Sequence, residues 1–216
     1  MNNLDPHAGV PLLFAGTPLA QASGALLLLH GRGASAEDIL GLGEAIAPAG
    51  VALVAPQAAD HTWYPYSLLA PRHQNEPYLT SALNRIEAAI NELQAAGIPF
   101  DRIALAGFSQ GASLSSEFIA RHPRRYAALL AFTGALIGSP GAPLSVDGPL
   151  NGMPALFSAG DHDPYIPWPR IEQSADLYRE AGAAVTLNRY PGRPHTILQE
   201  EVDAARPLIA HLGSKA

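Results

Sequence analysis

Residues 102–111 read Arg-Ile-Ala-Leu-Ala-Gly-Phe-Ser-Gln-Gly, and this stretch says most about the fold. An apolar run typical of a buried strand leads into Gly107-Phe108-Ser109-Gln110-Gly111, the Gly-x-Ser-x-Gly pattern of a nucleophile elbow. In that motif a sharp strand-to-helix turn exposes the serine Oγ, and a side chain at either glycine would collide with the neighbouring strand or helix. A helical pattern follows from Gln110, as the motif requires. We expect Ser109 to be a nucleophile, with an ordinary glycine-rich turn as the alternative.

Outward from this stretch, short apolar runs alternate with longer amphipathic segments, which is typical of parallel strands joined by crossover helices. The expected strands are 25–29, 51–55, 103–106, 127–132, 155–159 and 185–189, with a weaker candidate at 12–15. The expected helices are 36–47, 76–96, 110–121, 170–181 and 196–212. The pattern predicts a mostly parallel, doubly wound α/β sheet in a single domain over residues 1–216, with an edge strand in the N-terminal segment 1–23.

The composition excludes several kinds of functional site. The chain has 216 residues, no cysteine and a net charge of −6. The absence of cysteine excludes disulfides, thiolate metal sites and a cysteine nucleophile. The acidic balance argues against nucleic-acid binding. Residues 1–31 lack the charged start of a signal peptide and the longest purely apolar run is 25–29, so we expect a cytoplasmic protein without stable membrane insertion.

A serine nucleophile needs a general base, and histidine is the usual one. His195 lies in a Gly/Pro-rich loop directly after the last expected strand. His122 and His211 fall at helix ends, where a solvated or capping role is the simpler interpretation. We therefore expect His195 to be the base, with a solvated loop histidine as the alternative.

The base needs a carboxylate that holds its tautomer. Asp161 and Asp163 both follow an expected strand, at the edge where open α/β sheets place their sites. Spacing alone does not separate the two, and the other one would be a turn-forming residue. Asp161, His162 and Asp163 could be taken as metal ligands, but adjacent residues rarely converge on one ion. We expect no metal and no cofactor.

The turn His30-Gly31-Arg32-Gly33 follows the strand expected at 25–29. In elbow-type hydrolases this loop supplies one backbone N–H of the oxyanion hole, and the residue after the nucleophile supplies the other. Here these residues are Arg32 and Gln110. The alternative for the turn is a plain strand-to-helix connection.

Taken together, these motifs resemble the phospholipase/carboxylesterase family of α/β-hydrolases, which includes acyl-protein thioesterases and small bacterial carboxylesterases. The resemblance covers about residues 24–212 and rests on Leu29-His30-Gly31-Arg32-Gly33, Gly107-Phe108-Ser109-Gln110-Gly111, Gly160-Asp161-His162-Asp163-Pro164 and Pro194-His195. It implies Ser109 as nucleophile, His195 as base and Asp163, the aspartate before proline, as acid. It also implies an α/β-hydrolase fold without a separate cap domain, and the backbone of Arg32 in the oxyanion hole.

The chain departs from the family pattern where many members have leucine at position 32 and aspartate at 34; it has Arg32 and Ala34. Because a backbone N–H stabilises the oxyanion, we expect the oxyanion hole to be retained despite the different side chain. We also expect a charged side chain at the mouth of the pocket to alter substrate preference. The loop 57–75 looks closer to bacterial carboxylesterases than to the protein thioesterases.

The expected activity is hydrolysis of small or short-to-medium acyl esters, with thioesters and lysophospholipids as further substrates to test. Loops 57–75 and 133–153 are long enough to be functional but too short for a cap. Four aromatic residues are candidates for the walls of the substrate pocket: Trp63, Tyr64, Tyr66 and Trp168. The alternative is that these side chains pack the loops onto the core. The rival functions are an acyltransferase or perhydrolase with the same triad, and a non-catalytic binding protein of this fold. The sequence is also compatible with a homodimer.

Overall fold

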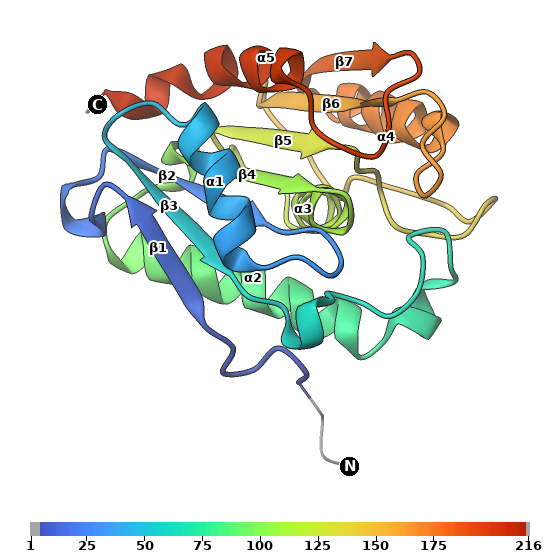
Figure 1. The fold of residues 1–216 in the computed structure, drawn as a ribbon, viewed down its shortest axis with the longest axis horizontal. Helices are drawn as coiled ribbons and strands as arrows, with labels where there is room; N and C mark the ends of the chain where they lie inside the picture. Colours follow the sequence, from blue (N-terminus) through green and yellow to red (C-terminus); the bar gives the residue numbers. More distant parts are fainter. Residues whose placement is uncertain (1–4, 215–216) are drawn as a thin grey trace.

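A seven-stranded sheet organises the computed structural model, which describes residues 5–214 (Figure 1). The strands are β1 (Leu12–Gly16), β2 (Gly24–Leu29), β3 (Val51–Pro56), β4 (Ile103–Phe108), β5 (Ala128–Phe132), β6 (Pro154–Gly160) and β7 (Ala184–Tyr190). Their order in the sheet is β1-β3-β2-β4-β5-β6-β7. Only β1 runs antiparallel to its neighbour, β3; the other strands form parallel pairs. All seven expected strands are present, including the weaker candidate, which forms the edge strand β1.

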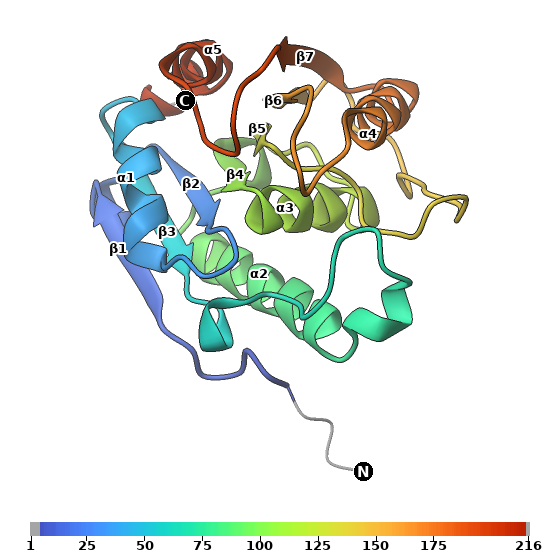
Figure 2. The same cartoon turned by 45° about the vertical axis from the view of Figure 1, so that its right-hand side comes forward.

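The central strands are apolar throughout because both faces of the sheet are covered. Every residue of β2, β3 and β5 is buried. The helices are α1 (Ala36–Ile46), α2 (Tyr78–Ala95), α3 (Gln110–Arg121), α4 (Trp168–Glu180) and α5 (Gln199–Ile209). α2, α3 and α4 pack on one face, and α1 and α5 on the other (Figures 1 and 2). The predicted doubly wound α/β architecture is confirmed.

Parallel strands bring distant loops to one edge of the sheet. Leu29 at the end of β2 pairs with Gly107 near the end of β4, and Phe108 pairs with Phe132 at the end of β5. The loops that follow β2, β4, β6 and β7 therefore open at the same carboxyl edge, where such sheets place their sites. Two long connections also approach this region: 57–77, which contains the 3₁₀ turns Ala59–His61 and Arg72–Asn75, and 133–153.

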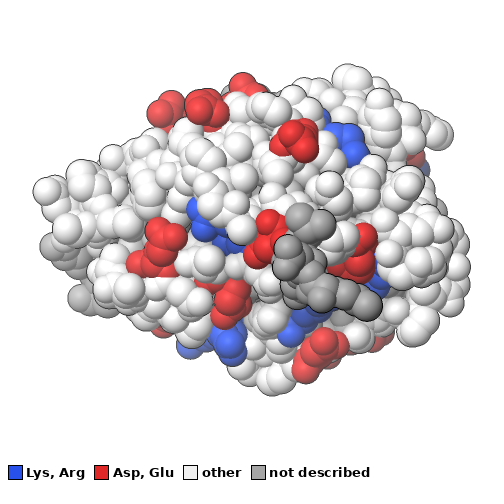
Figure 3. All heavy atoms as spheres, turned by 90° about the horizontal axis from the view of Figure 1, so that it is seen from below, with Lys and Arg blue, Asp and Glu red and all other residues white. Residues whose placement is uncertain are grey.

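The surface carries few charges. Figure 3 shows one face on which acidic and basic side chains are scattered between large uncharged areas, without a continuous basic zone in its visible part. Within residues 5–214, no helix combines the length and the hydrophobicity that crossing a membrane requires.

Candidate active site

Ser109 lies between β4 and α3 in a strained backbone conformation. Its φ of 55° and ψ of −115° are unusual for a residue with a side chain. The turn closes tightly enough that a Cβ on Gly107 would lie 2.5 Å from the carbonyl carbon of Gly111, and a Cβ on Gly111 would lie 2.0 Å from the oxygen of Leu29. Both positions therefore require glycine, which is the physical basis of the Gly-x-Ser-x-Gly pattern.

Ser109, His195 and Asp163 form a hydrogen-bonded chain. Ser109 Oγ lies 2.9 Å from Nε2 of His195, whose Nδ1 lies 2.6 Å from Oδ2 of Asp163. Oδ1 of Asp163 accepts the backbone N–H groups of Tyr165 at 2.9 Å and Ile166 at 3.0 Å. The carboxylate is thus fixed in orientation, and it holds the imidazole with Nε2 free to accept a proton from the serine.

Asp161 has a different role from Asp163. Its Oδ1 accepts the backbone N–H of Gly192 at 2.9 Å, and its Oδ2 lies 3.5 Å from Nη2 of Arg189. The N–H of Gly192 is the largest cause that lowers the pKa of Asp161 below its ordinary value. Asp161 therefore ties the loop that carries His195 to the end of β6, while Asp163 contacts the imidazole itself.

Among the described residues, the backbone N–H groups of Arg32 and Gln110 make no hydrogen bond. Gln110 is the first residue of α3, where an N–H has no intrahelical partner. Close packing brings the Arg32 loop to the elbow, since a Cβ on Gly31 would lie 3.3 Å from the Phe108 ring and 3.6 Å from Cβ of Ser109. In contrast, the N–H of Gly33 donates to the oxygen of His61 at 2.8 Å.

A cavity of about 540 Å³ opens beside Ser109 and His195. Residues 64–68 form one wall and residues 164–166 form another. Burial raises the pKa of Tyr64 far above its ordinary value, so this wall presents a neutral phenol. The side chain of Tyr165 packs edge-on against the His195 ring, with ring centroids 4.9 Å apart.

The model of the Phospholipase/Carboxylesterase family matches residues 16–212. The chain belongs to this family. It is 39% identical to a phospholipase/carboxylesterase from Dyadobacter fermentans, whose crystal structure superposes with a TM-score of 0.91 over 97% of this chain and 100% of that one. This likeness and the strand order establish the α/β-hydrolase fold.

Two curated relatives match this chain over about half of their own length. "Putative esterase NocK" of Nocardia uniformis subsp. tsuyamanensis is 33% identical over 93% of this chain and 54% of its own length. Acyl-protein thioesterase 1 of Neurospora crassa is 32% identical over 52% of this chain and 47% of its own. The chain thus spans about half the length of the curated relatives it matches.

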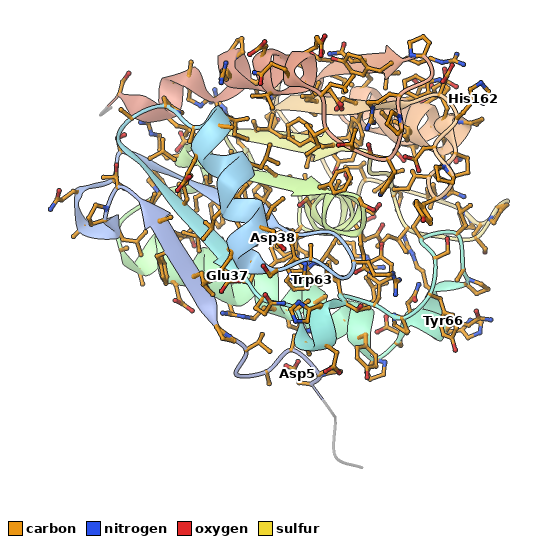
Figure 4. All side chains as sticks on the ribbon, viewed as in Figure 1. Asp5, Glu37, Asp38, Trp63, Tyr66 and His162 are labelled. Carbon is orange, nitrogen blue, oxygen red and sulfur yellow. The ribbon has the colours of Figure 1, made fainter. Side chains whose placement is uncertain are left out.

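Of the four aromatic residues expected in the substrate pocket, two line the cavity. Tyr64 and Tyr66 lie in its wall. The structure corrects the expectation for Trp63 and Trp168, which are 0% and 7% exposed, belong to the hydrophobic core and do not line the cavity. Figure 4 shows Trp63 among the ribbons of the interior and Tyr66 extending from the edge of the molecule. Trp63 is held there by its indole N–H, which donates to the oxygen of His30 at 2.9 Å.

The structure places the Arg32 side chain at the cavity and gives it contacts that the sequence did not predict. Its guanidinium donates to the carbonyl oxygens of Tyr64 at 2.8 Å, Pro65 at 2.9 Å and Tyr66 at 2.8 Å. Sequence gave no sign of this, because the acceptors are backbone groups about thirty residues away. The charge therefore fixes the cavity wall.

Residues beyond the expected set also belong to the site. Tyr165 packs on His195, and Ser113 lines the cavity one helical turn after Ser109. Ser113 could have been found from its spacing on α3, whereas the position of Tyr165 depends on how the loop folds back. In residues 5–214 there is no group of three His, Asp or Glu side chains that could hold a metal ion. The His162 side chain is 85% exposed.

Proposed function

We propose that the protein is a serine hydrolase that cleaves carboxylic esters through an acyl-enzyme on Ser109. The observation that carries this proposal is the pair of hydrogen bonds from Ser109 Oγ to His195 Nε2, 2.9 Å, and from His195 Nδ1 to Asp163 Oδ2, 2.6 Å. This arrangement activates a serine for attack on a carbonyl. Membership of the phospholipase/carboxylesterase family supports the same activity.

In the first half of the reaction, His195 Nε2 accepts the Ser109 proton while Oγ attacks the ester carbonyl carbon. Negative charge then develops on the carbonyl oxygen, and the N–H groups of Arg32 and Gln110 stabilise it. The charged imidazole, held by Asp163, donates its proton to the departing alcohol oxygen. The carbon–oxygen bond of the ester breaks, and the acyl group stays on Ser109.

In the second half, His195 accepts a proton from water while the water oxygen attacks the acyl-enzyme carbonyl. The same N–H groups stabilise the second oxyanion. Its collapse breaks the bond to Ser109 Oγ, which takes the proton back from His195, and the carboxylic acid leaves. Water is consumed, one acid and one alcohol form, and no cofactor enters the balance.

The cavity supports small or short-to-medium acyl esters as substrates. Its volume of about 540 Å³ is within the ordinary range for small-molecule sites, and it is open to solvent along the rim formed by Tyr66 and Tyr165, which are 56% and 65% exposed. Leu68 and Ile166 supply apolar surface deeper in the walls. Thioesters and lysophospholipids belong in the same substrate panel.

The test is hydrolysis of p-nitrophenyl esters of increasing acyl length, alongside acyl thioesters and a lysophospholipid. We expect turnover of the shorter p-nitrophenyl esters by the native chain and a loss on the order of 10⁶ in kcat for Ser109→Ala. Ser116→Ala is the matched control, since this serine of α3 donates to Ala112 in its own helix and lies outside the cavity. Undiminished turnover in Ser109→Ala would overturn the proposal.

A further inference from the structure

A buried arginine lies two residues before His195. The side chain of Arg193 is 1% exposed. Its Nη1 donates to the carbonyl oxygens of Pro194, at 3.2 Å, and of Thr196. These are the two residues that flank His195, so one guanidinium holds the peptide groups on both sides of the imidazole.

The other groups around Arg193 come from the rigid part of the fold. Its Nη2 donates to Oγ1 of Thr133 at 2.6 Å, and its Nε lies 3.4 Å from Oε2 of Glu201. Thr133 directly follows β5 and Glu201 lies in the first turn of α5. The guanidinium therefore connects an exposed loop to a strand end and a helix start.

Thr133 and Glu201, the two residues that anchor the guanidinium, are themselves held in place. Glu201 is 0% exposed; its Oε1 accepts from Oγ of Ser158 at 2.6 Å and its Oε2 from the N–H of Leu198 at 2.9 Å. Thr133 has a φ of 56°, which is strained for a β-branched residue, and its N–H donates to the oxygen of Ser158 at 2.7 Å. Anchors held in this way leave the guanidinium little freedom to move.

We propose that Arg193 is a positioning residue that sets the place of His195 relative to Ser109; this inference rests on the proposed hydrolase function. A buried ion pair contributes little net stability compared with well-packed apolar side chains. The guanidinium offers N–H donors in a planar fork, and here it donates to two carbonyls and a hydroxyl while its Nε faces the Glu201 carboxylate as an ion pair without a hydrogen bond. The contacts with the residues beside His195 give the buried charge a role in addition to packing.

The experiment separates the hydrogen bonds from Arg193 to Pro194 and Thr196 from its ion pair with Glu201. In Arg193→Met/Glu201→Gln both charges disappear, so the fold survives while the bonds to Pro194 and Thr196 are lost. In Glu201→Gln alone, Arg193 keeps those bonds but loses its counter-ion. We expect the double variant to keep a near-native urea midpoint and KM, with kcat lower by about 10- to 100-fold, because small misplacements of catalytic groups are costly. We expect Glu201→Gln to show the reverse: a lower urea midpoint and a near-native kcat.

Arg193→Lys covers the case in which a double variant or Glu201→Gln does not fold. Lysine keeps the charge beside Glu201 but cannot span both carbonyls, so kcat should fall with KM unchanged. Arg179→Met, which removes an arginine from an exposed ion pair with Asp176, is the control and should match the native chain. A native kcat in both Arg193 variants, or a kcat in Glu201→Gln as low as in the double variant, would overturn the inference.

A second readout is independent of turnover. The proton between His195 Nδ1 and Asp163 gives a downfield ¹H NMR signal when the imidazole is held in place, and we expect this signal in the native chain and its broadening or shift in the two Arg193 variants. An unchanged signal in both variants would overturn the inference. If the native chain hydrolyses no ester, the proposed function fails on that result, while the NMR comparison still tests the positioning of His195.

Discussion

Arg32 and Gln110 share one acceptor, the carbonyl oxygen of Tyr64. Nη2 of Arg32 donates to it at 2.8 Å and Nε2 of Gln110 donates to it at 2.7 Å. Oε1 of Gln110 also accepts the N–H of Trp63 at 2.9 Å. The two residues whose backbone N–H groups we assign to the oxyanion hole therefore use their side chains to hold the cavity wall, which couples the position of the wall to that of the hole.

Replacement of Gln110 by leucine tests this coupling. The buried N–H of Trp63 would lose its acceptor, so we expect the free energy of unfolding to fall by about 1–3 kcal/mol and kcat/KM to fall about 10-fold as the wall loosens. Arg32→Met should cost less on both counts, because its guanidinium is partly solvated and Gln110 still holds Tyr64. Urea unfolding and ester kinetics measure both effects. A larger loss in Arg32→Met than in Gln110→Leu would contradict the account.

Much of the fold was predictable from the sequence, because the central strands are buried on both faces and consist of apolar runs. The edge strands show where that signal weakens. Both β1 (Leu12–Gly16) and β7 (Ala184–Tyr190) pair with a single strand of the described sheet and are only partly buried, and β7 accordingly contains polar residues such as Asn188 and Arg189. Helix ends shifted by up to a few residues; the last helix begins at Gln199, after the loop that carries His195, and not at Thr196.

The choice between Asp163 and Asp161 gives a second prediction. Asp163→Asn would favour the wrong tautomer of His195, and we expect kcat to fall by about 10⁴ with the fold retained. Asp161→Asn should have a much smaller effect, since this side chain contacts Gly192 and Arg189 and not the imidazole. The measurement is kcat for one activated ester in both variants. Equal losses would argue against the assignment of Asp163 as the acid.

Glu117 gives a prediction about stability. This carboxylate of α3 has a side chain only 1% exposed, and it lies 2.7 Å from both Nη2 of Arg72 and Nε of Arg121. It also accepts the N–H of Ile137 at 2.9 Å, so it joins the helix to both long connections. We expect Glu117→Ala to reduce the free energy of unfolding by about 3 kcal/mol in urea titrations.

The control for Glu117 is Asp176→Ala, which breaks an exposed ion pair with Arg179 and should cost no more than about 1 kcal/mol. If the two variants lose equal stability, the buried carboxylate does not join these segments as described.

Two buried histidines make stability depend on pH. Burial is the largest cause that lowers the pKa of His7 and of His30 below the ordinary value of 6.5. Nε2 of His30 accepts the N–H of Ala58 at 3.1 Å, so protonation would also break this bond. As pH falls below 6.5, these two rings take up protons in the unfolded chain before they do so in the folded chain. Stability therefore falls as pH drops below 6.5, by at most about 1.4 kcal/mol per pH unit for each histidine.

Urea titrations between pH 7.5 and about pH 5 measure this slope, and His30→Gln should flatten it. NMR titration of the two rings gives an independent check. Ring signals that titrate above 6.5 in the folded protein would contradict the prediction.

The candidate site was predictable to the extent that it depends on local motifs. Ser109 and the loop of Arg32 follow from glycine patterns that the turn geometry demands. The partner of His195 did not follow from spacing, because Asp161 and Asp163 differ only in which way the loop after β6 turns. The burial of Trp63 and Trp168 and the contacts of Arg193 depend on packing between segments far apart in the chain, which periodicity does not encode.

The most direct test of the central claim is intact-mass spectrometry of the chain after incubation with a fluorophosphonate, followed by peptide mapping. A serine activated by His195 reacts with this reagent, whereas a non-catalytic binding protein of the same fold does not. We predict stoichiometric labelling on Ser109 alone, strongly slowed labelling in His195→Gln, and none in Ser109→Ala. An unlabelled native chain, or a label on another residue that persists in Ser109→Ala, would contradict the assignment of Ser109 as the nucleophile.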